Sequence, residues 1–188
     1  MSARSAIACL LALAAAGCTK ESPAPEQANV ATVSPDEAPP ASTPALKAGA
    51  VDRTHQGEVA PDAQLATLDG KPTTLDAYRG KPLLVNLWAT WCAPCIAEMP
   101  SLDKAAANVI AIALNQGEEP AKMQPFLTRA KLAHLQTLSD PKMAVSLGLA
   151  TNLPTTLLYD AQGKEVWRVA GGRDWATPES LALIAEAR

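Results

Sequence analysis

The chain has 188 residues, a formal net charge of −3 and a hydrophobic content of 48%. This length allows one domain of ordinary size plus extensions, and it is sufficient to bury a core. The sequence has no run of Lys or Arg that would make a basic stripe for phosphate backbones, so the composition argues against nucleic acid as a partner.

Residues 1–17 have the layout of a signal peptide. Arg4 supplies a positive charge, and an uninterrupted run of small and apolar residues follows at 6–16. A helix that spans a membrane needs about 20 apolar residues, so this run is too short to stay in the bilayer as one. We therefore expect the segment to be removed on export.

The end of this segment, Ala15-Ala16-Gly17-Cys18, resembles the lipobox of bacterial lipoproteins. In that motif the signal is cut off before the Cys, which then carries the lipid, so the resemblance implies lipid attachment at Cys18. Plain secretion, with cleavage after Ala16, is the alternative. Removal of Arg4 with the signal would make the net charge more negative.

Residues 18–52 are rich in Pro and Ala and contain no aromatic residue. A segment of this composition cannot bury enough apolar surface to fold. We expect a disordered linker that tethers a folded domain, residues 53–188, to the lipid anchor at Cys18.

Cys92 and Cys95 are the two cysteines in the part of the chain that is expected to fold, because Cys9 lies in the signal segment. They could form a structural disulfide, half of a zinc site or a dithiol that cycles with its disulfide. A ring this small stabilises a fold by only about 2 kcal/mol. His55 and His134 are not at ligand-like spacing, so we expect no metal site.

The flanks of the pair indicate a strand followed by a helix. Residues 83–88 are a short apolar run typical of a buried strand. A helix is predicted to begin near Ala93. Residues that would share one of its faces recur at three- and four-residue steps: Cys95, Glu98, Met99, Leu102 and Ala106. Cys92 would sit at the N-terminus of this helix, where the dipole lowers the pKa of a thiol. Cys92 is therefore predicted to be the exposed nucleophile and Cys95 the more buried resolving thiol.

The rest of the domain alternates strands and helices. We predict strands at 109–114 and 135–138 and a helix at 119–133. Asp140 followed by Pro141 predicts the start of a short helix that ends at Gly148. A hairpin is expected at 155–160 and 164–170, and a last helix starts at Thr177-Pro178. The pattern is typical of a three-layer α/β domain with a mixed sheet.

The segment "NLWATWCAPCIAEMPSL", residues 86–102, resembles the active-site segment of the membrane-anchored thioredoxin-like proteins of the TlpA and ResA type. The resemblance extends over "LATLDGKPTTLDAYRGKPLLVNLWATWC" and "LGLATNLPTTLLYDAQGKEVWRVAGG" and covers most of residues 60–188. It implies a thioredoxin fold, α/β/α, with an N-terminal hairpin and a helix-strand insertion at about 117–139. It also implies a cis peptide bond between Leu153 and Pro154.

The resemblance further assigns roles to single residues. Glu98 matches a family Glu beside the cysteines and would exchange a proton with Cys95, although a solvated helix carboxylate is the alternative. Asn86 stands where ordinary thioredoxins have a buried Asp, which leaves proton handling to Glu98 or water; the alternative is a purely structural polar residue. The residues expected to contact a substrate are Trp91, Ala93, Pro94, Leu153 and Pro154. Trp167 and Trp175 are predicted to be packing residues.

The function implied is that of a thiol:disulfide oxidoreductase on the periplasmic or extracytoplasmic side of a bacterial membrane. It would need no cofactor, would reduce disulfides of exported client proteins and would be re-reduced by a membrane thiol donor. Family analogy names apocytochrome c, and hence cytochrome c maturation, or copper-site cysteines as targets. No cation lies between the cysteines, which favours a reducing couple. The alternatives are a copper or client-binding carrier and an oxidase of the same fold.

Overall fold

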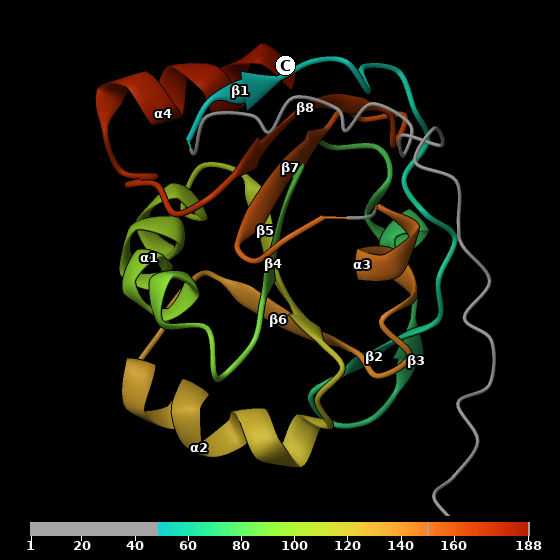
Figure 1. Ribbon diagram of the computed structural model, residues 1–188, viewed down its shortest axis with the longest axis vertical. Coiled ribbons are helices and arrows are strands. Elements are labelled where there is room, and N and C mark those ends of the chain that lie inside the picture. The colour runs from blue at the N-terminus through green and yellow to red at the C-terminus, as the bar shows by residue number, and fades with distance from the viewer. Residues whose placement is uncertain (1–48, 150, 188) are drawn as a thin grey trace, which may run out of the picture. The chain divides into compact units, whose positions relative to one another are not determined.

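The computed structural model describes residues 49–149 and 151–187 (Figure 1). The predicted signal peptide, Cys18 and the predicted linker up to residue 48 lie outside the described residues. The strands are β1 (Val51–Asp52), β2 (Leu65–Thr67), β3 (Pro72–Thr73), β4 (Leu83–Trp88), β5 (Ile110–Gln116), β6 (Gln136–Asp140), β7 (Thr155–Tyr159) and β8 (Glu165–Ala170). The helices are α1 (Ala93–Ala105), α2 (Pro120–Ala130), α3 (Ala144–Gly148) and α4 (Pro178–Ile184), with 3-10 turns at Leu75–Tyr78 and Ala185–Ala187.

The described strands form one mixed sheet in the order β1-β8-β7-β4-β5-β6-β2-β3. β4, β5 and β6 run parallel to each other, and the remaining neighbours are antiparallel. β2 and β3 make the expected N-terminal hairpin, and α2 with β6 makes the expected central insertion. No helix in this part of the chain is both long enough and apolar enough to cross a bilayer.

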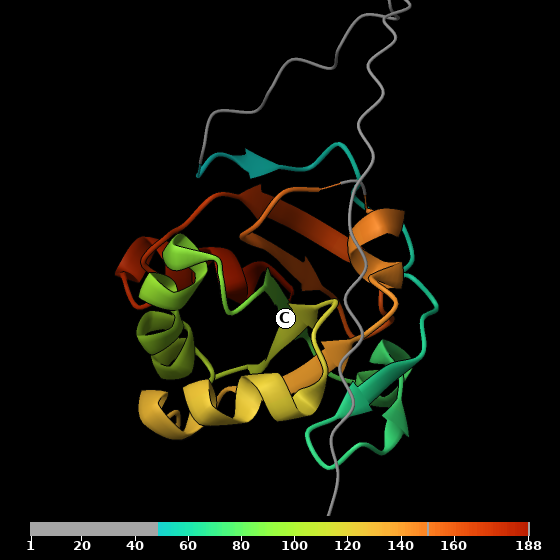
Figure 2. The same ribbon diagram turned by 60° about the horizontal axis from the view of Figure 1, so that its bottom comes forward.

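Side chains of β4 alternate between the two faces of the sheet, as the geometry of a strand requires. Leu84 and Trp88 belong to a core cluster that also contains residues of α1, α2 and α4. Leu83, Val85 and Leu87 belong to the opposite cluster, which includes Val145 of α3. The helices therefore cover both faces, and the predicted three-layer arrangement is confirmed (Figure 2).

Several boundaries differ from the sequence prediction; the helix predicted at 119–133, for example, is Pro120–Ala130 and ends where Lys131 adopts the left-handed conformation. Val51 and Asp52, placed in the linker by composition, pair with Val169 and Arg168 of β8, so the folded part starts before residue 53. The short third helix starts at Ala144, three residues later than Asp140-Pro141 predicts. Asp140 instead ends β6, and its carboxylate accepts hydrogen bonds from the backbone N–H groups of Ala144 and Val145 at 3.0 and 2.8 Å. The N-cap residue is Met143, but the Asp140 carboxylate still binds free N–H groups of the first helical turn from the end of the strand.

Asp103 ties α1 to the segment that enters β6. Its Oδ1 accepts hydrogen bonds from the backbone N–H groups of Ala133, His134 and Leu135 at 2.9, 2.8 and 2.9 Å. Desolvation raises the pKa of Asp103, but the backbone hydrogen bonds outweigh it and the net pKa is lowered. The carboxylate thus anchors the insertion to the helix that carries the cysteines.

We expect Asp103→Asn to reduce the free energy of unfolding by about 1.5–3 kcal/mol at neutral pH, the usual worth of hydrogen bonds to a charged group. Because the folded-state pKa is lowered, the stabilisation by Asp103 is present above the unfolded-state pKa and is lost as pH falls through the folded-state pKa. Denaturant unfolding of both proteins from neutral to acidic pH checks this. The exposed Asp62 serves as the control, since Asp62→Asn should change stability by less than about 0.5 kcal/mol.

Candidate active site

Cys92 and Cys95 lie at the start of α1, as the sequence predicts. β4 ends at Trp88, and a short loop leads to Cys92, which is the N-cap of the helix. The two sulfurs form a disulfide of 1.98 Å. The backbone N–H of Cys95 donates to Cys92 Sγ at 3.4 Å, so this sulfur takes the place of a capping oxygen. A negative charge on Cys92 Sγ would therefore be stabilised by the free amide end of α1.

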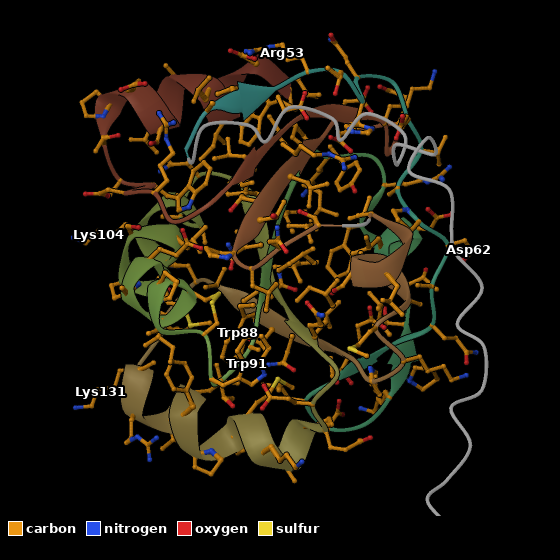
Figure 3. All side chains as sticks on the ribbon, viewed as in Figure 1. Arg53, Asp62, Trp88, Trp91, Lys104 and Lys131 are labelled. Carbon is orange, nitrogen blue, oxygen red and sulfur yellow. A yellow bond between two sulfur atoms is a disulfide. The ribbon has the colours of Figure 1, made fainter. Side chains whose placement is uncertain are left out.

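The exposure of Cys92 is lower than the sequence predicts. Cys92 is 5% exposed and Cys95 is fully buried, so the expected order holds but Cys92 is not an exposed side chain. The reason is that the disulfide and the N-cap contact turn the Cys92 sulfur toward the helix. Its neighbours Trp91, Ala93 and Pro94 are exposed, Trp91 by 71%, so the pair lies directly beneath the surface. Trp88, at the end of β4, is buried, and Figure 3 labels both tryptophans.

The Leu153–Pro154 bond is cis, as the resemblance implies. Pro154 directly precedes β7, whose first residue Thr155 pairs with Leu87 near the end of β4. The carbonyl of Pro154 accepts a hydrogen bond of 2.8 Å from the N–H of Gly171, just after β8. The proline loop, the cysteine loop and the end of β8 therefore meet at one edge of the sheet.

Glu118 fixes the loop that leads into Cys92, a role that no sequence pattern indicated. Its carboxylate accepts hydrogen bonds from the backbone N–H and the hydroxyl of Thr90 at 2.8 and 2.5 Å, and from Asn115 Nδ2 at 2.7 Å. Desolvation raises the pKa of Glu118, but the hydrogen bonds from Thr90 and Asn115 outweigh it and the pKa is lowered. Since 28 residues separate Thr90 from Glu118, no local pattern could have found the contact.

Glu98 is a buried residue of α1, one turn after Cys95, and its carboxylate accepts hydrogen bonds from three N–H groups. Asn86 Nδ2 donates to Oε1 at 2.7 Å, while the backbone N–H of Arg173 and the indole N–H of Trp175 donate to Oε2 at 3.0 and 3.2 Å. Desolvation is the largest influence and raises the pKa of Glu98, and the three hydrogen bonds offset it only in part. Glu98 is thus not a solvated surface carboxylate.

The loop from Gly171 to Ala176, between β8 and α4, holds two of these donors, Arg173 and Trp175, in place. The Arg173 guanidinium contacts Ser180 Oγ, the carbonyl of Gly49 and Glu179 Oε1 at 2.9, 3.1 and 2.9 Å. Trp175 is fully buried and stacks on Trp167, with ring centroids 6.0 Å apart. Trp175 is therefore a packing residue, as predicted, but it is also a hydrogen-bond partner of Glu98, which the sequence did not indicate.

An open groove of about 480 Å³ runs between α1 and this loop and reaches the Glu98 side chain. Its lining includes Pro94, Gly172 and the charged residues Lys104, Arg173 and Asp174. Lys104 lies on the outer side of α1 (Figure 3). The groove gives Glu98 a route for proton exchange with solvent. Within residues 49–149 and 151–187, no group of three or more His, Cys, Asp or Glu side chains is arranged to hold a metal ion.

Replacing Glu98 with Gln is expected to stabilise the protein at neutral pH. Because the folded-state pKa of Glu98 is raised above its ordinary value of 4.5, the stability contributed by this group is present below the unfolded-state pKa and is lost as pH rises through the folded-state pKa. Gln does not ionise, so Glu98→Gln should gain on the order of 1 kcal/mol at pH 7. The gain should vanish in acid.

Thermal unfolding from acidic to neutral pH checks this expectation, with Glu119→Gln at an exposed position as the matched control. The control should show no comparable change of stability with pH. A Glu98→Gln protein that loses stability relative to the wild type as pH rises would contradict the raised pKa.

Comparison with known proteins places this geometry in a family. The family model described as Redoxin matches residues 55–182. The chain is 34% identical over 113 residues to the thiol-disulfide oxidoreductase ResA of Geobacillus thermodenitrificans, covering 57% of this chain and 65% of that protein. It is also 34% identical over 137 residues to the thiol:disulfide interchange protein DsbE of Vibrio cholerae, covering 69% of this chain and 73% of that protein. The alignment with ResA thus spans slightly less than two thirds of that relative.

Solved structures agree with these matches. The pneumococcal exposed lipoprotein thioredoxin of Streptococcus pneumoniae superposes with a TM-score of 0.53 at 27% identity, over 65% of this chain and 99% of that one. The matched residues in the Redoxin model include the cysteine pair, Glu98 and Pro154. The chain belongs to the Redoxin family.

Proposed function

We propose that the protein is a thiol:disulfide oxidoreductase that reduces disulfides in exported proteins. The observation that carries this proposal is the Cys92–Cys95 disulfide across the first turn of α1, beneath a surface that exposes Trp91. The names of the relatives, thiol-disulfide oxidoreductase and thiol:disulfide interchange protein, support it.

The reduced pair would act in two exchange steps. The Cys92 thiolate attacks one sulfur of a client disulfide; a bond forms between Cys92 and that sulfur, and the other client sulfur leaves as a thiolate. Cys95 then gives its proton to the Glu98 carboxylate and attacks Cys92 Sγ. This closes the Cys92–Cys95 disulfide and releases the second client thiolate. Two electrons pass to the client, and a membrane thiol donor would return the pair to the dithiol.

Glu98 suits the proton step because it is buried on the same helix face as Cys95, one turn away. Its raised pKa brings the carboxyl closer to the working pH of a general base, and its groove connects it with solvent. The same carboxyl would return the proton when the disulfide is reduced again. Glu98 thus supplies the proton transfer that a buried Cys95 cannot obtain from bulk water.

The direction of electron flow is proposed to be reduction of the client. An oxidase of the DsbA kind depends on strong stabilisation of its reduced form, and its potential lies about 150 mV above that of thioredoxin, or roughly 7 kcal/mol for two electrons. Here Ala93 and Pro94 separate the cysteines, and neither carries a charge. The Cys92 thiolate is then stabilised by the helix N-terminus without a charge between the cysteines. This weaker stabilisation of the reduced form favours a low reduction potential, and hence reduction of the client.

Client contacts are proposed to come from exposed or edge residues around the pair: Trp91, Ala93, Pro94, Leu153 and Pro154. An extended client segment would lie across this edge, with its disulfide over Cys92. Lipid attachment at Cys18 would hold the domain on the periplasmic or extracytoplasmic side of a bacterial membrane. Apocytochrome c or copper-site cysteines are proposed clients.

The test is to measure the reduction potential of the purified protein against glutathione, together with the rate at which the reduced protein reduces a disulfide-bonded model protein. We expect a potential near those of thioredoxins and glutaredoxins, roughly −200 to −270 mV, and catalysed reduction. A potential near that of DsbA would identify an oxidase. Stoichiometric retention of copper without exchange would instead identify a carrier.

A further inference from the structure

The side-chain amide of Asn86 connects β4 to both Glu98 and Thr156. Asn86 Nδ2 donates to Glu98 Oε1 at 2.7 Å and to Thr156 Oγ1 at 2.9 Å. The amide is 1% exposed, and its Oδ1 is buried without a hydrogen-bond partner among the described residues. A buried carbonyl oxygen without a partner costs free energy, so its position beside a buried carboxyl calls for a physical reason.

The observed arrangement suits the ionised form of Glu98. A carboxylate has only acceptor sites, and here all three neighbours donate N–H groups to it. Oε2 already accepts two of these groups, from Arg173 and Trp175, whereas Oε1 accepts one. An added proton therefore has its place on Oε1, which faces Asn86. Once protonated, Oε1 becomes a donor that needs an acceptor, and the Nδ2 group of Asn86 cannot supply one.

A half-turn of the Asn86 amide removes this conflict. Oδ1 would then occupy the place of Nδ2 and accept the proton of Glu98 Oε1. Thr156 Oγ1 is a hydroxyl and can donate as well as accept, so its contact with Asn86 would persist with the direction reversed. Each orientation leaves one atom of the amide unpaired, which means that the amide itself favours neither strongly. The proton on Glu98 decides between them.

We propose that Asn86 is a positioning residue whose side-chain amide reverses its orientation when Glu98 gains or loses a proton. The inference rests on the proposed role of Glu98 in carrying protons for Cys95. As a consequence of this reversal, the Glu98 carboxyl has a complementary hydrogen-bond partner in Asn86 in either protonation state. Both states are therefore accessible during turnover. An Asp at this position would instead repel the Glu98 carboxylate.

Other charged or titratable groups near Glu98 are few. Cys92 and Cys95 precede it on α1; Lys104, Arg173 and Asp174 line the groove that reaches it. The Arg173 guanidinium is turned away to Ser180, Gly49 and Glu179, and only its backbone N–H faces the carboxylate. On the sheet side, Glu98 faces Asn86 and, beyond it, Thr156, neither of which carries a charge. Asn86 is thus the partner on Oε1 that can adapt.

The test is a pH titration by nuclear magnetic resonance of the purified, oxidised full chain. The side-chain NH₂ resonances of Asn86 and the carboxyl carbon of Glu98 are followed together. We expect both to move with one midpoint, and the Asn86 resonances to stop responding in Glu98→Gln. Asn86 resonances that stay fixed while Glu98 titrates would overturn the proposal. Because this readout needs no client, its failure is distinct from failure of the proposed reductase activity.

Three variants extend the test. Asn86→Leu removes both the donor to the ionised carboxylate and the acceptor for the protonated one, so it should raise the proton affinity of Glu98 by less than the roughly 10-fold expected for loss of one hydrogen bond to a charged group. Asn115→Leu is the matched control: it removes the donor that another buried strand Asn supplies to Glu118, and it should leave the Glu98 midpoint unchanged. If Asn86→Leu does not fold, Thr156→Val keeps Asn86 and tests the second contact. In Thr156→Val the Asn86 resonances should still follow Glu98 but with an altered midpoint, and an unaltered midpoint would contradict the role of Thr156.

Discussion

Replacing Cys92 with Ala is expected to lower the rate of protein-disulfide reduction by at least about 10⁴-fold, the scale of loss when a covalent catalyst loses its nucleophile. Cys92 Sγ is the sulfur at the N-cap of α1, where the Cys95 N–H contacts it. Cys95 is fully buried one turn further along and has no access of its own to a client. The measurement is the rate at which the reduced protein, freed of added dithiol, releases thiols from a disulfide-bonded model protein.

The matched control is Cys95→Ala. This protein keeps the Cys92 attack but lacks the resolving thiol, so its first step should proceed at a rate comparable with the wild type while turnover stops. A burst of one client thiol per molecule is the expected signature. A Cys92→Ala protein that still reduces the client at the rate of Cys95→Ala would contradict the assignment of the two roles.

Replacing Trp175 with Ala is expected to give the largest loss of stability among single changes around the site. The side chain is fully buried, stacks on Trp167 and donates to Glu98 Oε2. Truncating a buried Trp costs about 3–5 kcal/mol, which corresponds to a fall in melting temperature of roughly 10 °C or more for a domain of this size. Thermal and denaturant unfolding measure the effect.

Two other substitutions serve as comparisons: Trp175→Phe separates the packing of the Trp175 ring from its hydrogen bond, and Trp91→Ala removes an exposed Trp. Trp175→Phe keeps most of the apolar area but loses the indole N–H, so it should cost less stability and raise the pKa of Glu98 further. Trp91→Ala, at a position that is 71% exposed, should change stability by less than about 0.5 kcal/mol. It should nevertheless slow the reaction with a client protein. Equal losses of stability in Trp91→Ala and Trp175→Ala would contradict the burial of Trp175 against Trp167.

Local patterns in the sequence predicted the elements that carry the site. The apolar run at 83–88 forms β4, and the three- and four-residue recurrence after Cys92 forms α1, which continues through Pro100 to Ala105. Thr177-Pro178 does start the last helix, with the Thr177 hydroxyl accepting from Ser180 N. These features depend on neighbours a few residues apart, which is why periodicity and capping residues were sufficient.

Contacts between distant segments were beyond the reach of such patterns. Trp175 meets Glu98 across 77 residues, and Thr90 meets Glu118 across 28. The burial of Cys92 also depends on its bond to Cys95 and on the contact of its sulfur with the Cys95 N–H, which the expected position at the helix start did not reveal. Asn86 could be noticed as an unusual polar residue in an apolar strand, but its partner could not be identified until β4 and α1 were placed together.

The most direct measurement is to locate the bond between the protein and a trapped client. Reduced Cys95→Ala protein and reduced Cys92→Ala protein are each mixed with a disulfide-bonded client, quenched with an alkylating reagent and analysed by mass spectrometry of the peptides. A mixed disulfide through Cys92 is expected in the first protein, and none through Cys95 is expected in the second. Adducts that form through Cys95 at comparable yield, or no adduct on either protein, would contradict it.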